Sequence, residues 1–196
     1  MEFKEFPIIN TDRFLLRQMS LADAPGVLEV LSDKDVTKDM GIRPLTSVEE
    51  AEGVISFMNK LFDLNQALRW GIIKKDTNTL IGTCGFNGWE VQRGSRGEVA
   101  YDLGKQYWRK GYMTEILTHV IGFGFHEMNL HRIEAFTNID ATPSKEILRK
   151  FGFYQEGVLR GYSLINGEYA DQYCYSLLKT EWDFQMYKRI RANDRI

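Results

Sequence analysis

The chain is predicted to be an α+β protein whose mixed, mostly antiparallel sheet carries helices on both faces. Two observations support this fold class. Strand-like segments in the first half are joined by short turns, which is typical of an antiparallel meander. A strand–loop–helix–strand–helix block follows, and a hairpin closes the pattern, so the chain should combine a βαβα unit with antiparallel strands.

The first half is expected to contain two helices and four strands. Residues 11–18 alternate like a strand, and Ser20 is expected to cap a helix that runs to Leu31. A second helix should begin at Thr46 or Ser47, because each has a Glu three residues later, as in a capping box. Residues 39–44 between these helices are predicted to be a loop. The other strands are expected at 68–74, 80–89 and 98–103, with turns at 76–78 and 92–97.

The second half is expected to begin with a long helix at 109–128. Its predicted buried stripe consists of Met113, Ile116, Leu117, Val120 and Ile121. The later elements are expected to be a strand at 132–137, a helix at 143–151, a hairpin of 156–166 and 169–178 around Asn166-Gly167, and a helix at 180–190. Since no repeat or linker is visible, we expect a single domain over 1–196, with a core at about 10–183 and a basic tail at 184–196.

The composition excludes several classes of function. A formal net charge of −2 provides no basic field for nucleic acid, so no direct nucleic-acid partner is expected. Cys84 and Cys174 match neither a disulfide framework nor a zinc site, and we expect buried free thiols. No apolar run approaches the ~20 residues of a membrane span, and residues 1–10 lack a signal-peptide pattern. A cytoplasmic protein without a membrane partner is therefore expected, with a homodimer left open.

The segment Gln106–Glu115 carries the strongest chemical signal in the chain. A predicted strand ends just before it and a helix begins inside it, so unpaired N–H groups and the positive end of a helix dipole point at the loop. Arg109 and Lys110 add positive charge, and Gly111 lets a ligand approach the backbone closely. The segment therefore predicts a phosphate-binding turn.

Several further strings occur in a recognisable order around this turn. They are Thr11–Arg17, Tyr101, Trp108–Glu115, His131–Ala135, Lys150–Phe153, Glu156–Arg160, Asp171, Tyr175–Leu178 and Glu181-Trp182. In this order they resemble the Gcn5-related N-acetyltransferase (GNAT) superfamily, and most of all its branch of ribosomal-protein Ser/Ala N-terminal acetyltransferases. The resemblance covers roughly residues 10–183.

The resemblance implies a GNAT-type fold, with a twisted sheet of about six to seven strands splayed into a V. The strand carrying Glu98 would part from the strand carrying Arg132, and acetyl-CoA would enter the gap as the acetyl donor for an amine. The pantetheine arm would pair along the strand edge at Val99, Tyr101 and Leu103. The pyrophosphate would rest on the turn formed by Arg109, Lys110, Gly111, Tyr112, Met113 and Thr114.

The chain departs from the family pattern at three positions. Arg109 stands where a second Gly is usual, and Met113 stands where Gly or Ala is usual. Ala141 stands where Asn is often found, three residues before Ser144. The resemblance therefore implies a turn with less backbone freedom, more reliance on the Arg109 side chain, and one missing amide contact to the pantetheine arm.

The chemistry of acetyl transfer suggests two catalytic side chains. An amine must lose its proton before it attacks a thioester, and Glu98 is the first candidate for the base, with an exposed strand carboxylate as the alternative. Ser144 is the candidate for binding near the cofactor sulfur, where the departing thiolate forms, with a helix-capping Ser as the alternative. Backbone N–H groups around Leu103 would stabilise the developing oxyanion.

Other clusters are read as structural. His119, His126 and Glu115 share a helix face, and surface residues explain them better than a metal site, so no metal is expected. Four aromatic residues would either wall an acceptor pocket or belong to the core, and the core reading is favoured. They are Trp70, Phe86, Trp89 and Tyr112.

These observations predict an enzyme that transfers acetyl from acetyl-CoA to a primary amine, with a protein N-terminus, for example of a ribosomal protein, as the leading acceptor. A small amine, such as a polyamine or an aminoglycoside, is the alternative. The acidic clusters at 33–35 and 49–52 favour a polyamine only weakly, because solvated helix faces explain them better. A CoA-binding sensor without turnover is a further alternative.

Overall fold

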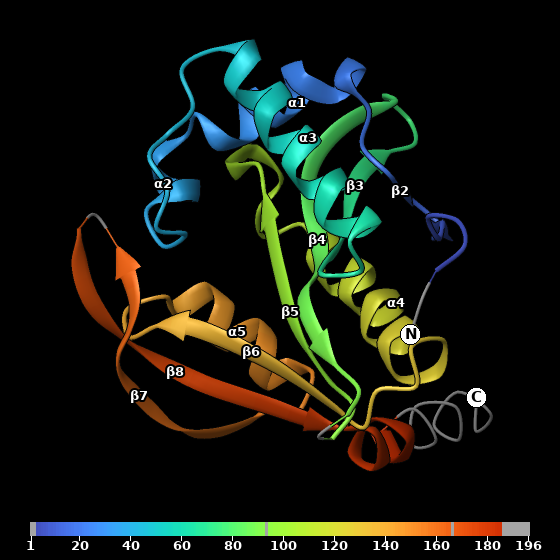
Figure 1. Ribbon diagram of the computed structural model, residues 1–196, viewed down its shortest axis with the longest axis vertical. Coiled ribbons are helices and arrows are strands. Elements are labelled where there is room, and N and C mark those ends of the chain that lie inside the picture. Colours follow the sequence, from blue (N-terminus) through green and yellow to red (C-terminus); the bar gives the residue numbers. More distant parts are fainter. Residues whose placement is uncertain (1–2, 93, 166, 186–196) are drawn as a thin grey trace.

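A computed structural model describes residues 3–92, 94–165 and 167–185, which are organised around one mixed sheet (Figure 1). The sheet has eight strands in the order β1-β2-β3-β4-β5-β6-β8-β7. The strands are β1 (Ile9–Asn10), β2 (Phe14–Arg17), β3 (Leu68–Lys74), β4 (Thr79–Glu90), β5 (Arg96–Leu103), β6 (Arg132–Asn138), β7 (Tyr154–Ile165) and β8 (Glu168–Leu178). Neighbouring strands are antiparallel except for the parallel pair β5 and β6, so the predicted α+β class is confirmed.

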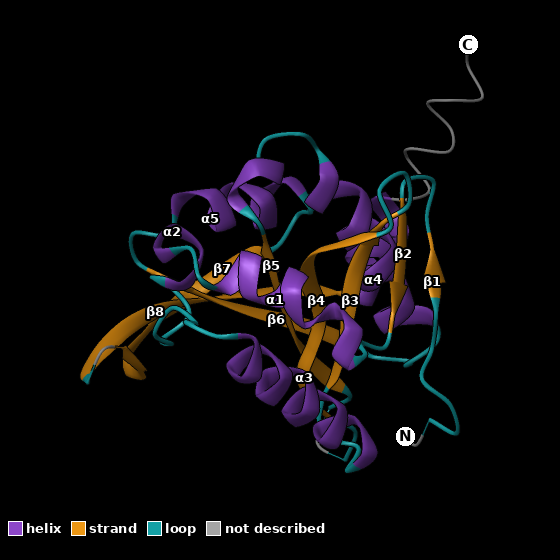
Figure 2. Cartoon of the chain, turned by 90° about the horizontal axis from the view of Figure 1, so that it is seen from above, coloured by secondary structure: helices purple, strands orange, loops and turns teal. Residues whose placement is uncertain are grey.

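The helices lie on both faces of this sheet, as predicted (Figure 2). α1 and α3 contact β4 and β3 over one hydrophobic cluster. α4 and α5 contribute to the larger cluster on the opposite face. The helices are α1 (Ala24–Leu31), α2 (Lys34–Thr37), α3 (Val48–Asp63), α4 (Tyr112–His126) and α5 (Thr142–Lys150), with 3-10 turns at η1 (Leu21–Asp23) and η2 (Lys105–Tyr107); residues 179–185 are also helical. No helix among the described residues has the length and apolar character to cross a bilayer.

Element boundaries follow the predictions closely, with identifiable exceptions. The predicted stripe of α4 is buried throughout, and Ser47 caps α3 by accepting a hydrogen bond from the Glu50 N–H. Two short elements, β1 and α2, were not predicted, and β1 makes the sheet one strand larger than expected. Arg93, Asn166 and residues 186–196, which include most of the expected basic tail and the end of the last predicted helix, lie outside the described residues.

The sheet divides into two halves at the boundary between β5 and β6. These strands pair only at Arg96 with Arg132, Gly97 with Ile133, and Glu98 with Glu134. Beyond this point β5 continues to Leu103 beside β4, whereas β6 continues to Asn138 beside β8. Figure 1 shows the resulting V, with its fork at the end where the two strands still pair.

A buried polar network ties three strands together on the face opposite α4. The Arg69 guanidinium on β3 donates to Asp102 Oδ2 on β5 at 2.7 Å and to Thr83 Oγ1 on β4 at 2.9 Å. The Arg69 and Asp102 side chains are only 7% and 5% exposed. Burying a charge is unfavourable unless it is paired and hydrogen-bonded. Arg69 and Asp102 therefore each depend on the other to remain buried in charged form.

We therefore expect Asp102→Ala to lower the free energy of unfolding by about 3–5 kcal/mol, because it leaves the Arg69 charge buried without its partner. Urea denaturation measures this directly. Glu90→Ala serves as the control, since it removes an exposed carboxylate paired with Arg96 and should cost no more than about 1 kcal/mol. Similar losses in both variants would contradict the special role of the buried pair.

Candidate active site

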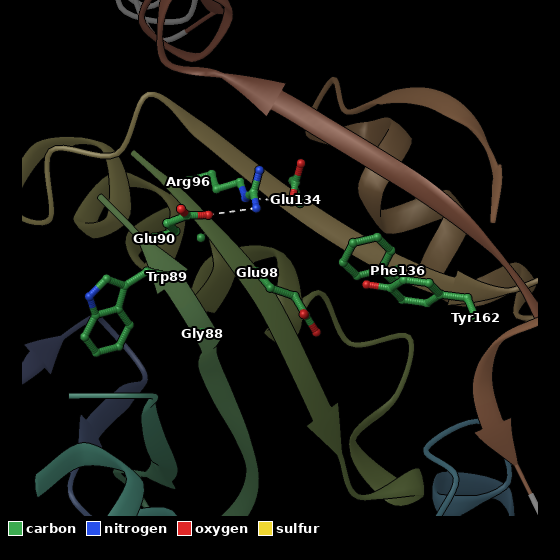
Figure 3. A pocket seen from close by; sticks show the side chains of 9 residues that line it. Gly88, Trp89, Glu90, Arg96, Glu98, Glu134, Phe136 and Tyr162 are labelled. Carbon is green, nitrogen blue, oxygen red and sulfur yellow. Dashed lines mark hydrogen bonds and ion pairs between the residues drawn. The ribbon is translucent and has the colours of Figure 1, made fainter. Parts of the chain in front are cut away.

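A pocket of about 200 Å³ opens at the fork of the V. β4, β5, β6 and β7 each contribute to its lining, so residues far apart in the sequence meet there (Figure 3). The lining residues are Gly88, Trp89, Glu90, Arg96, Gly97, Glu98, Glu134, Phe136 and Tyr162. The predicted residue Glu98 is therefore in a pocket, at the last position where β5 and β6 pair.

Glu98 differs from the other carboxylates around the pocket. Glu90 pairs with Arg96 at 2.9 Å, and Glu134 pairs with Arg132 at 2.7 Å. The Glu98 carboxylate instead accepts a hydrogen bond from the neutral Asn87 amide at 3.0 Å, and no salt bridge reaches it from the described part of the chain. Glu98 is thus a pocket carboxylate whose charge is not neutralised by a cation.

Three aromatic side chains line the pocket, and two of them, Phe136 and Tyr162, were not predicted from the sequence. The rings of Phe136 and Tyr162 lie 4.9 Å apart, and Trp89 lies on the β4 side. Burial raises the pKa of the Tyr162 hydroxyl. Of the four aromatic residues considered, only Trp89 lines the pocket. Trp70 and Phe86 are fully buried, as expected for core residues. The Tyr112 ring packs on the Phe14 ring, with their centroids 5.1 Å apart.

Both cysteines are free thiols, but their surroundings differ. Cys84 is fully buried, and burial raises its thiol pKa. Cys174 on β8 is half-buried and sits opposite Phe136 of β6, next to the aromatic lining. Burial also raises the pKa of the Cys174 thiol.

The turn before α4 has the backbone of an anion-binding loop. Gly111 caps α4 in the left-handed region with φ +72°, and a Cβ placed there would meet no heavy atom within 4 Å. Arg109 is also left-handed, with φ +59°, and because Gly111 is the left-handed N-cap, α4 begins at Tyr112 rather than at Arg109 as predicted. The side chains of Arg109 and Lys110 are exposed. Lys150, not selected from the sequence, brings its ammonium to 3.4 Å from Thr114 Oγ1 in the first turn of α4.

Beyond the fork, the side chains of Val99 and Leu103 point into the core, as does that of Met113 on α4. Contacts from these three residues to a ligand must therefore come from the backbone. Trp108 Nε1 already donates to the Leu103 carbonyl at 2.6 Å, and the Gly104 N–H donates to the Ile81 carbonyl at 2.9 Å. The Gly104 N–H is one of the backbone donors near Leu103, and it is already hydrogen-bonded within the protein.

Tyr101 and Ser144 approach each other across the gap. The Tyr101 hydroxyl on β5 lies 3.5 Å from the Ser144 carbonyl oxygen in the first turn of α5. Burial raises the pKa of Tyr101, so its hydroxyl stays protonated. On β6, Thr137 Oγ1 is buried and has no hydrogen-bond partner among the described residues.

Glu115 has a structural role. Its carboxylate accepts from Thr11 Oγ1 at 2.7 Å, the Arg13 N–H at 3.1 Å and Arg13 Nε at 2.6 Å, joining α4 to the start of β2. Burial alone would raise its pKa, but these hydrogen bonds together lower it. His119 Nδ1 lies 3.0 Å from the Glu115 carbonyl oxygen, and no group of three metal-binding side chains occurs in the described ranges.

Comparison with known proteins gives consistent matches. A family model described as "Acetyltransferase (GNAT) domain" matches residues 13–154. The uncharacterized N-acetyltransferase p20 of Bacillus licheniformis is 43% identical over 174 residues, covering 89% of this chain and 97% of its own. The [ribosomal protein uS5]-alanine N-acetyltransferase of Escherichia coli is 28% identical over 130 residues, covering 65% and 66%.

A similar solved structure is RimJ of Mycobacterium smegmatis in complex with CoA-disulfide. Its TM-score is 0.83 at 18% identity, with 92% of this chain and 91% of that chain covered. The shared fold confirms the expected arrangement of sheet and helices.

The two left-handed residues of the turn should respond oppositely to substitution. Gly111→Ala should lower the free energy of unfolding by about 1–2 kcal/mol through backbone strain alone. Arg109→Gly should leave it unchanged or raise it by up to about 1 kcal/mol, since strain is relieved while the unfolded chain gains freedom. Thermal unfolding with van't Hoff analysis measures both. Arg149→Gly in helix α5 is the control and should lose roughly 1 kcal/mol; an equal loss at Arg109 would contradict the assigned conformation.

Proposed function

Since this chain belongs to the GNAT acetyltransferase family and is an acetyl-CoA-dependent N-acetyltransferase, we propose that its acceptor is the N-terminal amine of a protein, first of all a ribosomal protein. Glu98, an un-neutralised carboxylate in a pocket at the fork of the V, is the observation that supports proton removal from an amine there. The name of the Escherichia coli relative, a ribosomal-protein alanine N-acetyltransferase, supports the acceptor class.

The residues along the gap fit CoA. The left-handed turn at Gly111 leaves open space before the N–H groups of α4, and the Arg109, Lys110 and Lys150 cations lie around it, as pyrophosphate binding requires. The backbone of Val99, Tyr101 and Leu103 lies on the β5 edge that β6 leaves uncovered, where a pantetheine arm would pair. Bound acetyl-CoA supplies a thioester that an amine can attack without an acyl-enzyme.

In this proposal Glu98 takes the proton from the acceptor ammonium, directly or through one water. Arg96 and Arg132 occupy the carboxylates of Glu90 and Glu134. Among the described residues Glu98 has only the hydrogen bond from the Asn87 amide, so it is the pocket carboxylate with an oxygen free to accept the proton.

We assign the sulfur side of the reaction to Ser144 and Tyr101. Ser144 lies in the first turn of α5, and its backbone carbonyl oxygen is 3.5 Å from the Tyr101 hydroxyl of β5. The Tyr101 hydroxyl remains protonated and reaches the same turn. We assign Ser144 to contact near the departing thiolate, with Tyr101 as the neighbouring hydroxyl donor.

One observation favours a small cationic amine as the second candidate acceptor. Glu90, Glu98 and Glu134 line the pocket, and among the described residues Arg96 and Arg132 pair with Glu90 and Glu134, which leaves Glu98 without an ion pair. This unpaired carboxylate would attract an acceptor that carries a second ammonium group, such as a polyamine.

Acetyl transfer should be tested with acetyl-CoA and a panel of peptides bearing ribosomal-protein N-termini, polyamines and aminoglycosides, following release of CoA thiol. We expect turnover with N-terminal Ser or Ala peptides, and blocked N-termini serve as controls. Glu98→Gln should lower kcat at least tenfold, since general-base catalysis contributes about 10²–10⁴-fold, while CoA affinity stays unchanged.

Turnover only with polyamines would replace the proposed acceptor by the second candidate. Tight CoA binding without turnover of any panel member would favour the sensor reading. Full activity of Glu98→Gln would place the base elsewhere.

The phosphate role of Arg109 makes a separate prediction. Arg109→Ala should weaken CoA binding about tenfold by calorimetry, because one charge-assisted contact to phosphate is lost. Arg109→Lys should retain part of the affinity, since it keeps the charge without the planar fork. Arg160→Ala, an exposed Arg on β7, is the control. An unchanged affinity in Arg109→Ala would remove this residue from the site.

A further inference from the structure

We propose that Asn87 is a positioning residue for Glu98 and that buried Arg69 sets its orientation. This inference rests on the proposed role of Glu98 as the base. Asn87 is neither a titratable group nor a lining residue of the pocket, and its type alone gives no sign of a role. Its contacts and its place in β4 carry the argument.

A β-bulge brings Asn87 to this position. Along β4 and β5, Phe86 pairs with Val99 and Gly88 pairs with Glu98, so Asn87 is the extra residue between two consecutive pairs. A bulge changes the direction of a side chain relative to a regular strand. Here the Asn87 Nδ2 group reaches Glu98 Oε1 at 3.0 Å on the neighbouring strand.

Arg69 determines which end of the Asn87 amide faces Glu98. Its Nη1 donates to Asn87 Oδ1 at 3.1 Å, so the amide oxygen faces the guanidinium and the NH₂ group faces the carboxylate. A guanidinium has only donors, so the reversed amide would place two donors against each other and two acceptors against each other. Arg69 is itself held by Thr83 and Asp102, and its side chain is 7% exposed.

The result is a continuous chain of hydrogen bonds from the sheet interior to the pocket. It runs from Asp102 through Arg69 and Asn87 to one oxygen of Glu98. Oε2, the other oxygen, makes no hydrogen bond to the described residues and is left for the acceptor's proton. Figure 3 shows the Glu98 side chain extending from β5 toward the side of the pocket where Phe136 and Tyr162 lie.

A neutral donor suits this task better than a cation. Asn87 lies between the Arg69 guanidinium and Glu98. The guanidinium therefore orients the Asn87 amide without pairing directly with the Glu98 carboxylate. Direct pairing, as at Glu134 with Arg132, would occupy the carboxylate oxygens with a cation instead of leaving one for the acceptor. The arrangement thus fixes the carboxylate while leaving it able to act as a base.

Asn87→Asp separates positioning from a merely structural role. The new carboxylate still accepts from Arg69, so a structural role for Asn87 would be preserved. Toward Glu98, however, it presents a charged acceptor in place of a neutral donor, so the pH profile of kcat should shift in Asn87→Asp but not in Asn87→Ala, which only removes the donor. We expect kcat to fall between about tenfold and a hundredfold, as for a misplaced catalytic group, with CoA affinity unchanged. Asn87→Ala should also lower kcat, and Asn59→Asp, which alters a structural hydrogen bond from α3 to Met19, should retain it.

The double variant Asn87→Asp/Glu98→Gln completes the test. If Asn87 acts through Glu98, the second substitution should add little to the loss in Glu98→Gln alone, giving a strongly non-additive cycle. An impaired Glu98→Gln with a fully active Asn87→Asp would overturn the positioning role and leave the proposed base intact. A fully active Glu98→Gln would overturn both. Thermal unfolding of each variant identifies any loss of activity that comes from misfolding.

Discussion

The parting of β5 from β6 after three residue pairs is the constraint on which the rest of the molecule depends. A parallel pair that continued to Leu103 would fill its own hydrogen bonds and close the sheet. Because it stops at Glu98, one strand edge remains uncovered, the helices α4 and α5 stand on either side of the gap, and a pocket forms at the fork. The uncovered edge of β5 and the pocket at the fork are two ends of the same discontinuity.

The buried Arg69 network connects stability with chemistry. Its pairing with Asp102 is what makes a charge tolerable inside the sheet. The same guanidinium then has a spare N–H group for Asn87, so the network that fixes the strands also reaches the pocket. Changes in this network will therefore alter the unfolding equilibrium and, under the proposed role of Asn87, turnover as well, so the two effects must be measured separately.

Periodicity made most elements predictable. Strand β3 has the bounds that were expected, and the stripe of α4 is buried as its spacing required. What could not be read from the sequence came from strands meeting in space: Phe136 and Tyr162 belong to β6 and β7, and only the sheet order brings them to Glu98. The bulge at Asn87 and the left-handed Arg109 were also hidden, since neither residue type demands such a backbone.

The two cysteines give the molecule a selective chemical handle. Cys84 is sealed in the core, so thiol reagents should not reach it in the folded state. Cys174 is half-buried directly opposite Phe136, on the strand that backs the aromatic side of the pocket. A small environment-sensitive fluorophore attached at alkaline pH, where more of the Cys174 thiol is ionised, would therefore sit beside this pocket and report what enters it, without any cysteine having to be introduced or removed.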